Sequence, residues 1–128
     1  LERADAHPLE PGEYDALQQQ RREDAERWER WFAGEGVSAL LEPTVPDVAW
    51  PRGPGYDHAG SDIRLIELTH HWDWTGQPAV ALPAGLGEAT GLPVSVSLIG
   101  PAGSDWQLLA LGEALQSELG VPEPSSSR

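Results

Sequence analysis

The side chains of this chain best suited to chemistry lie close together in one short polar stretch. Carboxylates and imidazoles in this combination can bind a metal ion, move a proton or bind a polar substrate. If the stretch is helical, Glu67 and His70 share one helix face, whereas His71 points about 100° away. The sequence has no second histidine-rich segment, which disfavours a metal site. We predict a substrate-binding role, with ordinary capping or surface roles as the alternative, for Glu67, His70, His71, Asp73 and Trp74.

A second group, Asp57, His58 and Ser61, contains the residue types of a Ser/His/Asp hydrolase. Neighbouring residues on one loop rarely converge as a triad, and the sequence has no Gly-x-Ser-x-Gly elbow, so we expect no triad here. Arg52, which has aromatic residues on both sides, suits the mouth of a pocket and bidentate binding of a carboxylate. A solvated loop arginine is the alternative. We expect no catalytic residue on this chain.

Composition excludes several classes of function. The formal net charge of −13 opposes binding to nucleic acid or to an anionic membrane. Cysteine and lysine are both absent, so a thiol nucleophile, a Schiff base or an amine base cannot come from this chain. We expect no cofactor and no metal. There is no apolar run near the roughly 20 residues that span a bilayer, and no secretory signal, which predicts a soluble, cytoplasmic protein.

The polar residues must be positioned by a small number of helices and strands. Residues 13–33 lack proline and glycine and carry one apolar stripe, which predicts a long helix that ends at Gly34 and Gly36. Residues 37–44 form a short strand candidate. Asp62 is a candidate N-cap for a helix from residue 63 to about 72 or 74, which would carry the polar stretch.

The second half predicts two strands and a final helix. Residues 79–83 and 94–99 are apolar on both faces, with only small serine interruptions, and such strands are usually covered by helices on both sides. Ser104 is a good N-cap for a helix over 105–119, and residues 122–128 are expected to be a flexible tail. Three strands and three helices in 128 residues can hardly cover both faces, so the α/β sheet is expected to be incomplete.

Several segments, in order and spacing, resemble the C-terminal portion of the amidase-signature hydrolases. SALLEPT at 38–44 is similar to the family's DALLTPT, and THHWDWTGQP at 69–78 is similar to T-x-P-x-N-L-T-G-x-P. AVALPAG at 79–85 is similar to ALSVPAG, and GLPVSVSLIG at 91–100 is similar to GLPVGLQLIG, before a leucine-rich helix. The resemblance covers residues 12–121 and implies that 1–121 is the C-terminal segment of an amidase domain.

This resemblance implies a larger α/β/α fold with a mixed central sheet. The family uses a Ser nucleophile, a bridging cis-Ser and a Lys base, and all three belong to the N-terminal part of its pattern. The chain also starts at Leu1 and contains no methionine, so we expect a fragment, a cleavage product or a subunit. Two departures affect the substrate class: His71 stands where the family has Pro, and Asp73 stands where it has Asn, between Trp72 and Trp74.

The predicted function is the C-terminal part of an amidase that hydrolyses linear amides and is inactive alone. It would complete the sheet and line the substrate pocket. Its partners would be the N-terminal segment with the Ser and Lys residues and a small amide substrate, and the full enzyme is a candidate homo-oligomer. The alternatives are a non-catalytic scaffold remnant of the family and part of a glutamine-type amidotransferase subunit.

Overall fold

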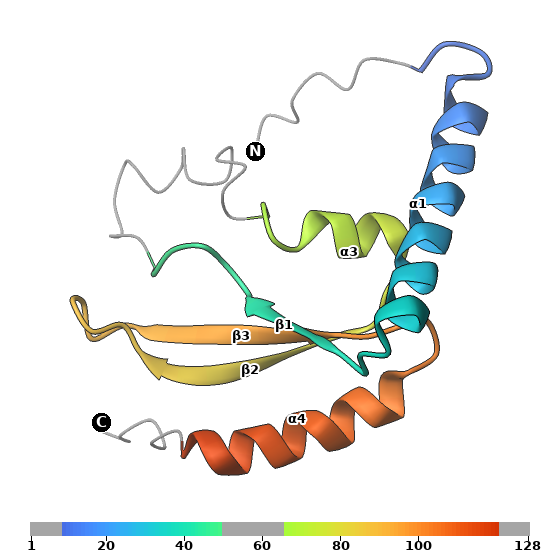
Figure 1. Ribbon diagram of the computed structural model, residues 1–128. Helices are drawn as coiled ribbons and strands as arrows, with labels where there is room; N and C mark the ends of the chain where they lie inside the picture. Colours follow the sequence, from blue (N-terminus) through green and yellow to red (C-terminus); the bar gives the residue numbers. More distant parts are fainter. Residues whose placement is uncertain (1–8, 50–65, 121–128) are drawn as a thin grey trace, which may run out of the picture.

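The computed structural model describes residues 9–49 and 66–120 (Figure 1). Along the chain these form α1 (Glu13–Glu35), β1 (Leu40–Pro43), α3 (His70–Thr75), β2 (Ala79–Leu86), β3 (Pro93–Ile99) and α4 (Asp105–Leu119). The predicted α/β class is confirmed. No helix in the described ranges has the length and hydropathy needed to cross a bilayer. The loop with Arg52, Asp57, His58 and Ser61 and the expected tail at 122–128 lie outside the described residues.

The three strands form one sheet in the order β1-β3-β2. Both pairings are antiparallel, with Leu40 and Ala79 each opposite Ile99. The mixed sheet implied by the resemblance is therefore not seen among the described strands. The register of β2 shifts between Pro83 and Gly85, where Gly85 adopts φ +114°, a conformation that favours glycine.

Residues that pair in register project to the same side of an antiparallel sheet, so this sheet has two distinct faces. The first, which we call the α4 face, packs against α4 and is lined by branched apolar side chains. Leu108 of α4 is 1% exposed against it, and Leu115 of the same helix is half-buried. Figure 1 shows α4 running along this side of the sheet. The sheet residues of the cluster are Val80, Leu82, Val96 and Leu98.

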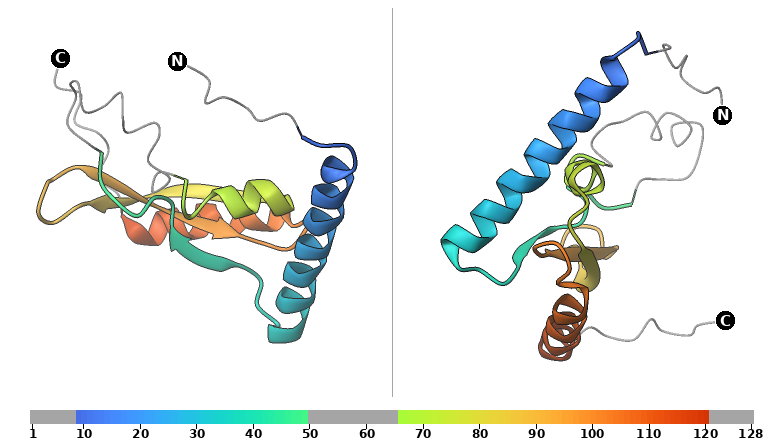
Figure 2. Two further views of the ribbon diagram at one scale, coloured as in Figure 1. Left: turned by 90° about the horizontal axis from the view of Figure 1, so that it is seen from above. Right: turned by 90° about the vertical axis from the view of Figure 1, so that its right-hand side faces the viewer.

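The opposite side, which we call the α3 face, is covered at one end only. Ile99 is fully buried there with Phe32 of α1 and Trp72 of α3, and Leu40 packs against this cluster. Figure 2 shows α1 crossing one end of the layered body. Farther along β2 on this face, Ala79, Ala81 and Pro83 are exposed. Helices thus lie on both sides of the sheet, but a large part of the α3 face has no cover from the described residues.

One carboxylate joins the layers. Glu29 of α1 accepts hydrogen bonds at the same oxygen, Oε1, from Gln77 Nε2 at 3.2 Å and from the backbone N–H of Ala102 at 2.8 Å. Gln77 lies just before β2, and Ala102 lies in the turn between β3 and α4. Glu29 therefore holds α1 against the start of β2 and against the turn that follows β3.

Three predicted boundaries are wrong. β2 runs to Leu86, three residues beyond the predicted end at 83. Residues 66–69 form a turn, not the middle of a helix: the carbonyl of Ile66 accepts from the N–H groups of both Thr69 and His70, and α3 begins only at His70. Strand 37–44 shortens to β1 because β3 ends at Ile99, opposite Leu40, and leaves the preceding residues no partner in that strand.

The helix ends were predicted more closely than the contacts that make them. α4 spans the predicted 105–119, but Ser104 makes no capping bond through its side chain, and its Oγ is buried with no hydrogen-bond partner among the described residues. Gly100 passes so close to Ser104 and Leu108 that a Cβ atom there would overlap them. At α1, Gly36 is the left-handed C-cap and Gly34 lies inside the helix.

Candidate functional site

α3 is anchored to the rest of the protein through Trp72. The indole is 4% exposed and lies 4.6 Å, between ring centroids, from Trp28 of α1. Its Nε1 donates a short hydrogen bond to Oε1 of Glu42 on β1. Trp72 thus joins an aromatic core on one side to a strand carboxylate on the other, and it fixes how α3 sits over the sheet.

His71 lies beside this anchor. Its ring is half-buried, 4.0 Å from the ring of Trp72 and stacked at 6.4 Å on Trp28, as measured between centroids. Burial lowers the pKa of His71 below its usual value of 6.5, and the nearby His70 acts in the same direction, while the carboxylate of Glu42 partly opposes them. The imidazole is therefore neutral at neutral pH and can both donate and accept a hydrogen bond.

Trp74 makes two hydrogen bonds to α1. Its Nε1 donates to Asp24 Oδ2 at 3.2 Å, and its carbonyl accepts from Arg21 Nε at 2.6 Å. Both partners lie on α1. Trp74 therefore joins α3 to α1, and its assignment to substrate binding stays a prediction.

The other three predicted residues are exposed. Nδ1 of His70 lies 2.9 Å from the carbonyl oxygen of Ile66. Glu67 lies in the turn before α3, so it does not share a helix face with His70, and that prediction is wrong. Asp73 makes no side-chain hydrogen bond to any described residue. Within residues 9–49 and 66–120, no three His, Asp or Glu side chains gather in a way that could hold a metal ion.

The structure adds polar residues that the sequence analysis did not single out. Glu42 of β1 pairs with Ser97 of β3, and Thr44 Oγ1 lies 2.8 Å from Ser97 Oγ. Ser95 and Ser97, the two serines of VSVS, both project to the α3 face. Their alternation with valine is the sequence pattern that could have indicated a polar face on this strand. The candidate site is thus a group of polar side chains where α3 meets β1 and β3. It consists of Glu42, Thr44, His71, Trp72 and Ser97.

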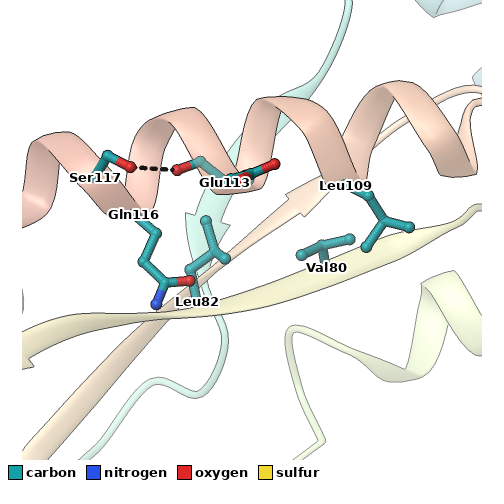
Figure 3. Close-up of a pocket in the computed structure, with 7 residues that line it drawn as sticks. Val80, Leu82, Leu109, Glu113, Gln116 and Ser117 are labelled. Atoms are coloured by element: carbon teal, nitrogen blue, oxygen red, sulfur yellow. Dashed lines mark hydrogen bonds between the residues drawn. The ribbon is translucent and has the colours of Figure 1, made fainter.

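A groove of about 510 Å³ lies on the other side of the sheet, between α4 and β2 (Figure 3). Val80 and Leu82 form its floor, and Leu109 of α4 overhangs it. At its rim, Ser117 Oγ donates to the carbonyl of Glu113 at 3.0 Å. Glu113 and Gln116 also line the groove, but the Ser117 hydroxyl is engaged by a backbone carbonyl and not by the Glu113 carboxylate, so no activated nucleophile is formed. The groove is better suited to packing than to catalysis.

Comparison with known proteins gives one consistent result. The family model described as Amidase matches residues 3–109. The mandelamide hydrolase of Pseudomonas putida is 32% identical over 120 residues, covering 93% of this chain and 24% of that protein. A component of the mitochondrial glutamyl-tRNA(Gln) amidotransferase of Mycosarcoma maydis is 38% identical over 91 residues, covering 68% of this chain and 17% of that protein.

A solved structure gives the same picture in three dimensions. The X-ray structure of the peptide amidase from Stenotrophomonas maltophilia superimposes with a TM-score of 0.66 and 25% identity, over 94% of this chain and 23% of that one. The chain therefore spans about a quarter or less of the length of these relatives.

Proposed function

This chain belongs to the amidase family, and on that basis we propose that it is the C-terminal part of an enzyme that hydrolyses linear amides. The family resemblance and the α/β fold that it implied are confirmed. The observation that carries the proposal is the match of residues 3–109 to the family in a chain that covers 24% of the mandelamide hydrolase.

Open surfaces of the fold support the proposal that this chain completes a larger sheet. β1 and β2 are both edge strands among the described residues, each with one side of its backbone unpaired. On α4, Leu109, which lines the apolar groove, is 51% exposed, and Trp106 of the same helix is 81% exposed. Exposed apolar surface beside open strand edges is typical of a surface that another part of a protein covers.

In the proposed mechanism, the catalytic residues and one wall of the substrate site come from two different segments. The N-terminal segment supplies the Ser nucleophile, the cis-Ser and the Lys, since this chain contains no lysine. The Ser oxygen attacks the amide carbonyl, the C–N bond breaks, and the amine leaves with a proton delivered by the Lys–Ser pair. Water then cleaves the acyl ester, with backbone amides stabilising the oxyanion. The chain described here contributes a wall of the substrate site through the residues near α3.

Complementation tests this division. The N-terminal segment and this chain are produced separately and together, and ammonia release is measured from a set of small linear amides that includes mandelamide. Activity is expected only when both are present. Hydrolysis by this chain alone would overturn the proposed division, and a folded pair with intact Ser and Lys that releases no ammonia would instead favour a non-catalytic remnant.

The relatives named as components of glutamyl-tRNA(Gln) amidotransferase favour one second candidate. In that case the complete protein would release ammonia from glutamine and would depend on further protein components. Glutamine and mandelamide compared side by side separate the two: preference for the small aromatic amide supports the hydrolase, and preference for glutamine supports the amidotransferase.

A further inference from the structure

We propose that Glu42 determines substrate choice by binding the positively charged group of an amide that carries an amine. This inference rests on the proposed amide hydrolysis and adds the class of substrate. It starts from the placement of a single carboxylate on the α3 face of the sheet.

Glu42 is held in a fixed position. It is half-buried on β1, and its Oε1 accepts the hydrogen bond from Nε1 of Trp72, which is itself 4% exposed. A carboxylate fixed by a buried indole loses little conformational entropy when it binds a ligand, because its side chain is already ordered. Glu42 is therefore preorganised for recognition.

No basic side chain neutralises this carboxylate within the described part of the chain. The ion pairs there are Arg27 with Asp24 and Arg30 with Glu26, both on α1. Arg21, the arginine of α1 that reaches α3, donates instead to the carbonyl of Trp74. The described groups beside Glu42 are the neutral N–H donor of Trp72 and the imidazole of His71, which is neutral at neutral pH. A half-buried carboxylate with only neutral neighbours is poorly compensated, so a cation from a ligand would be stabilised there.

The charges around Glu42 are also negative. Glu67 and Asp73 are exposed just before and on α3, and the whole chain has a net charge of −13. Such a field raises the local concentration of cations and lowers that of anions. An amide substrate with a carboxylate would be repelled from this face.

The sheet next to Glu42 offers room for the hydrocarbon part of such a substrate. Glu42, Ser97 and Ala81 form one row across the three strands, and Ala79 and Pro83 lie on either side of Ala81. The three β2 side chains are small and exposed. Two strand spacings, about 10 Å, separate Glu42 from Ala81, with Ser97 of β3 between them. The three β2 side chains thus form an apolar shelf one strand beyond Ser97.

The test uses the complete enzyme and two isosteric amides, 4-(aminomethyl)phenylacetamide and 4-ethylphenylacetamide. The ratio of their kcat/KM values is expected to favour the amine by about tenfold or more, as for a charge-assisted hydrogen bond. Glu42→Gln should reduce that ratio by about tenfold, and Glu42→Asp, which keeps the carboxylate, should retain most of it. Glu88→Gln, on the exposed loop between β2 and β3, is the matched control and should leave the ratio unchanged.

Binding measured by calorimetry with the same two amides gives a readout that does not need turnover. An unchanged ratio in Glu42→Gln, or a parent enzyme that prefers the ethyl compound, would overturn the role of Glu42 while hydrolysis itself stands. If neither amide is hydrolysed but the amine binds more tightly and loses that advantage in Glu42→Gln, the role of Glu42 stands and the proposed hydrolysis fails.

Discussion

The two faces of the sheet are formed by the same strands but carry different kinds of side chain. On the α4 face, Val80, Leu82, Val96 and Leu98 are branched and apolar and pack against one helix. On the α3 face the same strands carry alanine, proline and serine, with Glu42 at one edge and aromatic cover at one end only. Large branched side chains fill space and stabilise the fold, whereas small ones leave space that a ligand can occupy. Packing therefore runs along the α4 face, whereas on the α3 face it is confined to the end where Leu40 and Ile99 meet the aromatic residues. The rest of the α3 face is where we propose that recognition takes place.

The largest effect is expected when packing is removed from the α4 face. Leu108→Ala should lower the free energy of unfolding by about 2–5 kcal/mol, because Leu108 is 1% exposed and its loss leaves a cavity. Urea unfolding measures the change, with Gln107→Ala, on the exposed side of the same helix, as the control. Equal effects of the two substitutions would show that α4 does not hold the sheet.

The next largest effect concerns the polar bond on the α3 face. Trp72→Phe keeps an aromatic ring in the core but removes the N–H that Glu42 accepts, which should cost about 1–3 kcal/mol. A double-mutant cycle with Glu42→Gln, followed by chemical unfolding, should give a coupling energy of about 0.5–3 kcal/mol. Additive effects would mean that the two residues do not interact, and the argument for a preorganised carboxylate would lose its basis.

A smaller effect on stability is expected at Glu29, where α1 meets the start of β2 and the turn after β3. Glu29→Ala removes the acceptor shared by Gln77 and the backbone of Ala102 and should cost about 1–2 kcal/mol. Glu26→Ala on the same helix breaks only an exposed ion pair with Arg30 and should change stability by less than about 1 kcal/mol. Thermal unfolding of the two variants side by side is the measurement, and a reversed order would contradict the role of Glu29.

The smallest expected effect is a pH dependence that comes from His71. Because its pKa in the folded state lies below the usual 6.5, the unfolded state binds protons more readily. The stability contribution of the neutral imidazole is therefore complete above pH 6.5 and declines as the pH falls from there towards the folded pKa. His71→Phe should flatten this part of the stability profile. An NMR titration of the native ring that gives a pKa above 6.5 would contradict the assignment.

Local patterns predicted the helices better than the sites. α1 and α4 follow from apolar periodicity and glycine stops, and α4 has the predicted bounds. The helix predicted over 63–74 was wrong at 66–69 because two N–H groups share the carbonyl of Ile66, a turn that helical periodicity does not reveal.

The candidate site was predicted only in part, for a related reason. His71 was singled out, and the structure brings it next to Glu42 and Trp72. Glu42 and Ser97 come together only through the register of β1 with β3, a pairing between distant parts of the chain. Short sequence windows cannot give such a register. The alternating serines were interpreted as small interruptions of a strand that is apolar on both faces, which was wrong because Ser95 and Ser97 both lie on the α3 face.

The position of β3 in the sheet also bears on how the protein is made. β3 is the central strand, yet it is synthesised last of the three, so β1 and β2 leave the ribosome before their common partner exists. Both pairings must wait for residues 93–99, and the pairing of β1 with β3, which joins distant parts of the chain, is expected to be the slower one. A translation product that stops before β3 would carry two strands with free edges, which favours aggregation. The sheet therefore cannot form until residues 93–99 have been synthesised.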